Sequence, residues 1–133
     1  NAATAEAQPL PGGTETIWLV EDQDVVRDFA ARLLRRLGYN VYVFADGSEA
    51  VTMAREYPDK IHLLLTDLVM PGMSGKSLAE AMIAKHPRIA VIFMSGYPDS
   101  DMDLREHKSD FLPKPFTPLV LAQKVREMIE QDA

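Results

Sequence analysis

The chain has 133 residues, a formal net charge of −6 and no cysteine, and 47% of its residues are hydrophobic. This length suggests one domain with its own core, and the lack of cysteine excludes disulfide bonds and thiolate metal sites. Because the chain is acidic and contains no basic block, we expect no direct contact with nucleic acid or with an anionic membrane surface.

The first residues are rich in Ala, Thr, Gly and Pro. They lack the basic start and the apolar stretch of a signal peptide, and no later apolar run is long enough to span a membrane. We interpret residues 1–15 as a linker or a remnant of expression, and residues 16–133 as the folded domain. A chain that begins with Asn suggests a fragment of a longer protein.

Short apolar runs alternate with stretches of helical periodicity over the rest of the chain. The predicted strands are 17–20, 41–44, 61–67, 89–94 and 110–112. The predicted helices are 24–37, 46–57, 76–86, 100–107 and a final helix from Thr117. This alternation implies a parallel sheet with helices on both faces, and right-handed crossovers place the carboxyl ends of all strands at one edge.

Local signals mark several of the helix ends. Gly38 follows the first predicted helix, where a C-terminal glycine ends helices well. Asp46 is followed three residues later by Glu49, which resembles a capping box. Thr117 and Pro118 have the order of an N-cap and a first-turn proline.

Polar side chains gather where the predicted strands end, which is where ligands bind in open parallel sheets. They are Glu21, Asp22, Asp67, Ser95 and Lys114. Three converging carboxylates require a positive partner, and oxygen ligands without His or Cys favour a hard cation such as Mg²⁺. An aspartate can act as a nucleophile and become an aspartyl-phosphate, whose oxygens a hydroxyl and an ammonium group can hold.

Four segments at these strand ends together resemble the receiver domain of a bacterial two-component response regulator. They are Trp-Leu-Val-Glu-Asp at 18–22, Leu-Thr-Asp-Leu-Val-Met-Pro-Gly at 65–72, Phe-Met-Ser-Gly-Tyr at 93–97 and Phe-Leu-Pro-Lys-Pro-Phe at 111–116. The resemblance covers residues 15–131. It implies an α/β fold of the flavodoxin-like kind, a doubly wound five-stranded parallel sheet with strand order 2-1-3-4-5.

The resemblance also assigns the acidic residues. It implies that Asp67 is the phosphoacceptor and, with Asp22, a ligand of Mg²⁺. Glu21 is expected to support the ion through water, and the backbone carbonyl of Val69 to complete the protein ligation. Glu21 stands where the family more often has Asp, so its contact with the ion is expected to differ in detail.

Three further residues receive roles from the same resemblance. Ser95 and Lys114 are expected to contact the phosphoryl group, and the Lys114–Pro115 bond to be cis. Movement of Ser95 toward the new oxygens opens space into which Phe111 turns, and this repacks the face of the fourth helix, last strand and last helix. Plain core packing of Phe111 is the alternative to a moving switch.

The implied partner is a histidine kinase or a histidine phosphotransfer protein that donates from phosphohistidine, and the isolated domain is not itself an enzyme. The Glu-Asp pair at 21–22 and the segment 94–97 resemble receivers fused behind a hybrid sensor histidine kinase. We therefore expect a cytoplasmic domain, monomeric or weakly dimeric, without nucleic acid or membrane contact of its own, in a parent kinase that can be membrane-attached.

Three other hypotheses remain open. The first is a stand-alone single-domain response regulator. The second is a phosphohydrolase of the haloacid dehalogenase type, which usually has a second Asp where this chain has Val69 and a nucleophile after the first strand. The third is a receiver that makes only protein contacts, against which the acidic pair, Asp67 and Lys114 argue.

Overall fold

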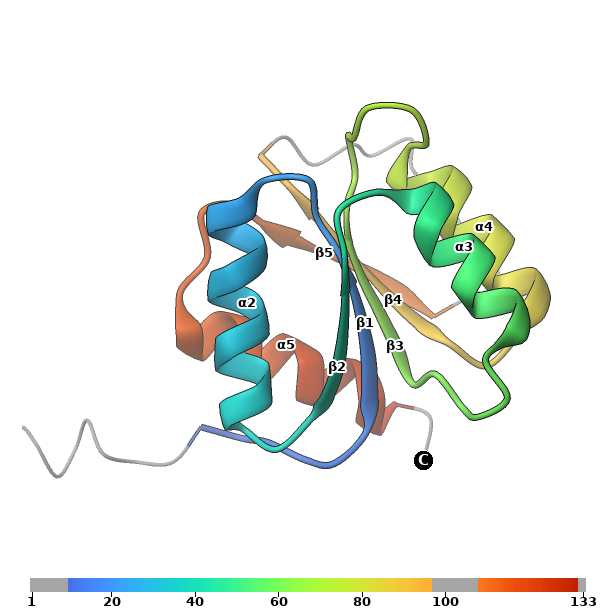
Figure 1. Cartoon of the computed structure of the whole chain (residues 1–133). Coiled ribbons are helices and arrows are strands. Elements are labelled where there is room, and N and C mark those ends of the chain that lie inside the picture. The colour runs from blue at the N-terminus through green and yellow to red at the C-terminus, as the bar shows by residue number, and fades with distance from the viewer. Residues whose placement is uncertain (1–9, 97–107, 132–133) are drawn as a thin grey trace, which may run out of the picture.

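The computed structural model describes residues 10–96 and 108–131, and the helix predicted over 100–107 lies outside them. Five parallel strands form one sheet in the order β2-β1-β3-β4-β5 (Figure 1). The strands are β1 (Thr16–Val20), β2 (Asn40–Phe44), β3 (Leu63–Asp67), β4 (Ala90–Ser95) and β5 (Ser109–Pro113). The predicted fold class and strand order are confirmed.

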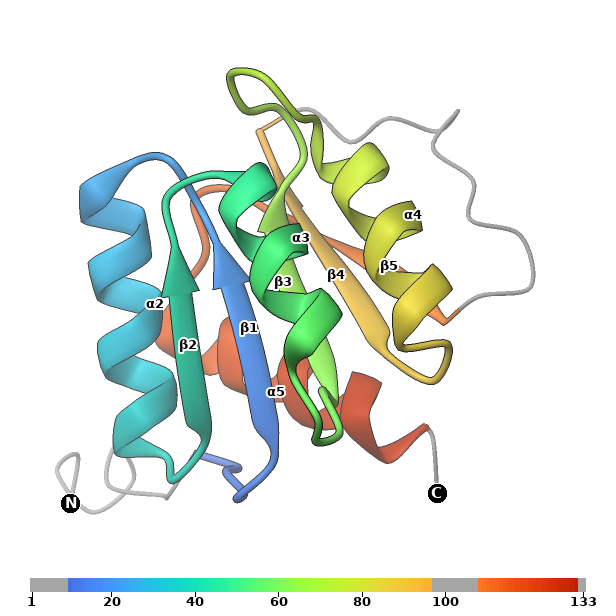
Figure 2. The same cartoon turned by 45° about the vertical axis from the view of Figure 1, so that its right-hand side comes forward.

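Helices cover both faces of the sheet. They are α2 (Asp24–Arg36), α3 (Gly47–Glu56), α4 (Gly75–Lys85) and α5 (Pro118–Glu130). Figures 1 and 2 show α2 and α5 on one face, and α3 and α4 on the other. In residues 10–96 and 108–131, no helix is long and apolar enough to cross a membrane.

The sheet divides the core into two clusters, as the side chains of β1 show. Ile17 and Leu19 pack with α2 and α5, whereas Trp18 and Val20 pack with α3 and α4. Successive side chains of a strand point to opposite faces, so an apolar run is buried on both sides. Strands β1, β3 and β4 are buried throughout, which holds their carboxyl ends rigidly at one edge.

The predicted helix caps are present. The Asp46 side chain accepts a hydrogen bond from the Glu49 N–H at 2.8 Å, and Thr117 caps α5 by accepting from Val120 at 3.2 Å. Gly38 follows α2 with φ of +105°, a left-handed conformation that favours glycine. The strand predicted from residue 61 begins two residues later, at Leu63.

Residues before β1 also pack on the domain. The Gly13 N–H donates to the Leu37 carbonyl at 3.2 Å, at the turn between α2 and β2. Arg126 of α5 donates to the Gly12 carbonyl at 3.0 Å and pairs with Glu15. The boundary between residues 15 and 16 stays a prediction.

Candidate functional site

An acidic cluster lies at the carboxyl edge of the sheet. Glu21 and Asp22 directly follow β1, and Asp67 is the last residue of β3. One oxygen from each of the three carboxylates lies within 4.8 Å of the others. Glu21 and Asp67 are buried, whereas Asp22 is exposed, so the cluster is reachable from solvent on one side.

Lys114 reaches this cluster from the end of β5. Its Nζ donates to Glu21 Oε1 at 2.8 Å and lies 3.3 Å from Asp67 Oδ1. The Lys114 N–H donates to the Ser95 carbonyl at 2.9 Å, and the peptide bond to Pro115 is cis, as predicted. The ammonium group therefore contacts two carboxylates of the cluster, and the negative charge exceeds what this lysine balances.

Burial and ion pairing shift the pKa values of Glu21 and Lys114 in opposite directions. Burial raises the pKa of Glu21, although its hydrogen bonds from Lys114 and from the Gln23 N–H oppose the rise. Burial alone would lower the pKa of Lys114, but the bond to Glu21 and the charges of Glu21 and Asp67 raise it. Lys114 is thus held in its charged form, while Glu21 carries a desolvation cost that an additional cation would offset.

The donor set fits a hard divalent cation. Glu21, Asp22 and Asp67 offer only carboxylate oxygens, the ligand type that Mg²⁺ prefers. Hydrogen bonds fix the backbone after Asp67, since the Leu68 N–H donates to the Met94 carbonyl at 3.0 Å. The Val69 side chain is 77% exposed, and the use of its carbonyl as a ligand stays a prediction.

The predicted switch residues lie on neighbouring strands. Ser95 is buried at the end of β4. Phe111 is half-buried on β5, and its ring centroid lies 5.7 Å from that of Phe93, its partner in the sheet register. The structure thus places Ser95 and Phe111 on the paired strands that end at the site, and their movement on phosphorylation stays a prediction.

The sequence analysis did not identify two residues that support the site. Arg27 of α2 donates to the Glu21 carbonyl at 2.7 Å and pairs with Asp24. A Cβ on Gly75 would lie 2.3 Å from the Asp67 carbonyl oxygen, so only glycine lets α4 begin this close to Asp67. The spacing of three residues between Asp24 and Arg27 indicates an ion pair on one helix face and could have been noticed. Nothing in the sequence around Gly75 distinguishes it from other loop glycines.

An apolar rim borders the acidic cluster, formed by Val25, Val26 and Phe29 of α2 with Pro115 and Phe116. Together with Gln23 and Lys114 it lines a groove of about 380 Å³. Val25 is 82% exposed. Phe29 is 38% exposed, and its ring lies 5.9 Å from that of Phe116.

Comparison with known proteins agrees with this geometry. The family described as response regulator receiver domain matches residues 17–126. The chain belongs to this receiver family. The receiver is 40% identical to the sensor kinase CckA of Brucella abortus (strain 2308) over 123 residues, which are 90% of this chain and 13% of CckA.

Two further comparisons cover nearly the whole of the matched chain. The crystal structure of the receiver domain of the hybrid histidine kinase CckA matches with a TM-score of 0.76 and 40% identity, over 86% of this chain and 98% of that one. The response regulator receiver protein CpdR of Brucella abortus (strain 2308) is 35% identical over 119 residues, which are 85% of this chain and 95% of CpdR. This receiver thus resembles both a domain of a larger kinase and a stand-alone protein.

Proposed function

We propose that this receiver accepts a phosphoryl group on Asp67 from a phosphohistidine, with Mg²⁺ held by Glu21, Asp22, Asp67 and the Val69 carbonyl. The observation that carries this proposal is the meeting of three carboxylates within 4.8 Å and a lysine ammonium 3.3 Å from Asp67. A buried carboxylate beside a cation site and a fixed ammonium group has the surroundings of a phosphoacceptor.

The proposed transfer balances without an additional reactant. One carboxylate oxygen of Asp67 forms a bond to phosphorus while the bond from phosphorus to the donor imidazole nitrogen breaks. The electron pair of that bond returns to the ring nitrogen. Mg²⁺, when bound, offsets the charge of the phosphoryl oxygens. Lys114 and Ser95 hold the same oxygens by hydrogen bonds. The isolated domain turns over no other substrate.

The proposed output is a change of surface. Phosphorylation gives Asp67 a charge of about −1.5 to −2. Ser95 moves toward the new oxygens, and Phe111 turns into the space that opens. The affected face comprises β5, α5 and the helix predicted over 100–107, so a local charge change biases a larger surface.

The proposed donor is a histidine kinase or a histidine phosphotransfer protein. A donor that brings its histidine to Asp67 covers the apolar rim, which accounts for the exposure of Val25 and Phe29. The 40% identity to CckA favours a receiver of a hybrid sensor histidine kinase. The proposed location of this domain is the cytoplasm, as expected from the sequence. The similarity to CpdR over 95% of its length supports a stand-alone regulator as the second candidate.

Other chemistry is less well supported. The receiver family and the place of Asp67 after β3, rather than after the first strand, argue against a phosphohydrolase of the haloacid dehalogenase type. A contact-only receiver does not need the carboxylate cluster or its lysine.

Intact-mass measurement after incubation with acetyl phosphate and Mg²⁺ tests the proposal. We expect one added phosphoryl group on the wild type, and none with a chelator or in Asp67→Asn. Asp59→Asn, which removes an exposed carboxylate elsewhere, is the matched control and should be phosphorylated normally. An adduct on Asp67→Asn, or none on the wild type with acetyl phosphate, phosphoramidate and a phosphorylated phosphotransfer protein, would overturn the proposal.

A further inference from the structure

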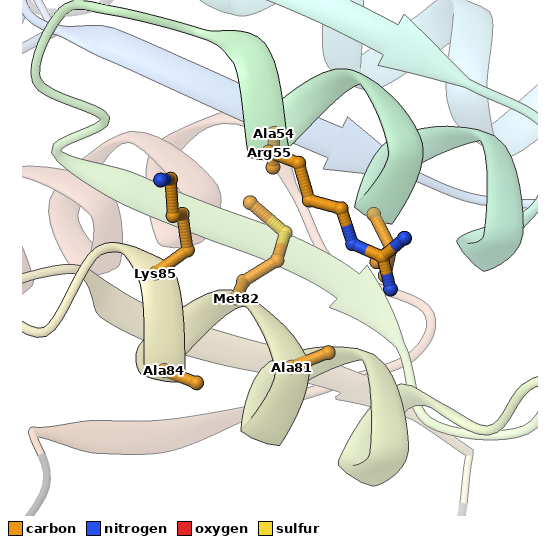
Figure 3. Close-up of a pocket in the computed structure, with 7 residues that line it drawn as sticks. Ala54, Arg55, Ala81, Met82, Ala84 and Lys85 are labelled. Carbon is orange, nitrogen blue, oxygen red and sulfur yellow. The ribbon is translucent and has the colours of Figure 1, made fainter.

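Helices α3 and α4 leave an open groove of about 360 Å³ between them (Figure 3). Buried Val51 and Met82 lie at its base. The small side chains of Ala54, Ala81 and Ala84 also line it, and Ala54 is buried. The groove is therefore lined mainly by apolar atoms, and three of its seven lining residues are alanines.

Two cations flank this apolar lining. Arg55 comes from α3 and Lys85 from α4, and both side chains are exposed (Figure 3). Neither forms an ion pair with another residue in 10–96 or 108–131. Arg55 and Lys85 thus give the edges of this apolar groove a positive charge in a chain of net charge −6.

The groove is fixed by the fold and lies away from the phosphoacceptor. The His86 ring Nε2 lies 3.0 Å from the Ala54 carbonyl oxygen, which ties the end of α4 to α3. The lining residues belong to the later turns of α3 and α4, whereas both helices begin at the carboxyl edge of the sheet. A partner in this groove would leave Asp67 accessible.

We propose that this α3–α4 groove binds an amphipathic α-helix of a partner protein, with an apolar side chain in the groove and carboxylates beside Arg55 and Lys85. Alanines in the lining allow the backbone of a third helix to approach closely. Carboxylates three or four residues from the apolar side chain share its helix face, so one short segment satisfies both features. A small anion would pair with the cations but leave the apolar lining exposed to water.

A displayed library of one helical peptide, randomised along one face, provides an unbiased test. We expect peptides selected on the wild-type receiver to carry an apolar residue flanked by Asp or Glu at a spacing of three or four. Their affinity should fall at least tenfold for the double variant Arg55→Glu/Lys85→Glu. Amide chemical shifts of the wild type on titration should change over 51–56 and 79–86.

The control variant is Arg32→Glu/Arg36→Glu, which makes the same charge change at exposed positions of α2. It should bind the selected peptides within twofold of the wild type. Both double variants should still be phosphorylated by acetyl phosphate, which shows that they are folded and separates this proposal from the function of Asp67.

Several outcomes would overturn the proposal. One is that peptides are not enriched on the receiver above an unrelated protein. Another is that the selected peptides lack acidic residues. A third is that the selected peptides bind the Arg55→Glu/Lys85→Glu variant as tightly as the wild type. Shifts in the groove that depend on receiver concentration without peptide would indicate a second copy instead. Equal shifts with inorganic phosphate alone would indicate a simple anion site.

Discussion

Two partly buried ion-pair clusters in this receiver differ in how completely their charges are matched. At the carboxyl edge, one ammonium group of Lys114 contacts two of three clustered carboxylates. Near the amino end of β1, the two terminal nitrogens of Arg126 bind the two oxygens of Glu15 at 3.1 and 2.7 Å. The first cluster retains excess negative charge, whereas in the second Glu15 is held by a bidentate pair, and the exposed Glu130 lies 3.1 Å from Arg126 Nε as a further partner.

The pKa values follow this difference. The hydrogen bond from Arg126 lowers the pKa of Glu15, and the same bond raises the pKa of Arg126. At Glu21, burial outweighs the bond from Lys114, so its pKa is raised instead. A matched pair stabilises the fold but offers nothing to a ligand, whereas an unmatched cluster of carboxylates attracts a cation, in line with the proposed function.

The largest effect should come from removing the cation of the unmatched cluster. We expect Lys114→Ala to slow phosphorylation by acetyl phosphate about 100-fold, because a positioned donor to the developing negative charge is lost. The initial rate of adduct formation by intact mass measures this. Lys124→Ala, which removes an ion pair with Asp110 elsewhere, is the control and should keep the wild-type rate. An unchanged rate in Lys114→Ala would contradict a direct role.

Breaking the matched pair should affect stability and leave the chemistry intact. We expect Arg126→Gln to lower the free energy of unfolding by about 2 kcal/mol, because Glu15 keeps a partly buried charge without its partner. Urea denaturation measures the change. The unfolding free energy of Arg126→Lys, which keeps the positive charge but loses the planar guanidinium group, should lie between those of the wild type and Arg126→Gln. A loss of phosphorylation in folded Arg126→Gln would remove the distinction between the clusters.

A smaller effect, a gain in stability, should follow from removing one negative charge of the carboxylate cluster. Without Mg²⁺, Asp22→Asn should raise the free energy of unfolding by about 1 kcal/mol, because one of the repelling carboxylates is neutralised. The same variant should lose the rise in melting temperature that Mg²⁺ gives the wild type. Asp28→Asn, an exposed carboxylate of α2 outside the cluster, should change neither quantity. Destabilisation by Asp22→Asn would argue against charge repulsion at this site.

The smallest effect should appear in the pH dependence of the matched pair. The pKa of Glu15 is lowered below its ordinary value of 4.5, so its contribution is present above that pH and is lost as the pH falls through the folded-state value. The difference in unfolding free energy between the wild type and Glu15→Gln should therefore shrink below pH 4.5. A constant difference over the acidic range would show that the ion pair does not contribute.

Much of the fold and of the site could be predicted from the sequence because the signals are local. Buried parallel strands leave continuous apolar runs, and caps such as Asp46 and Thr117 act within a few residues. Once the strands are known to be parallel, their carboxyl ends must share an edge, which brings Glu21, Asp67 and Lys114 together.

The partners of particular side chains were decided only by the tertiary structure. Lys114 bonds Glu21 across 93 residues, and Arg126 bonds Glu15 across 111, and neither pairing leaves a periodic pattern in the chain. The exposure of Phe29 and the groove between α3 and α4 depend on how the helices pack on the sheet. The sequence alone determined which elements form and which residues reach the edge. Helix packing and side-chain conformation, which arise from contacts distant in sequence, decided which charges are matched and which surfaces stay open.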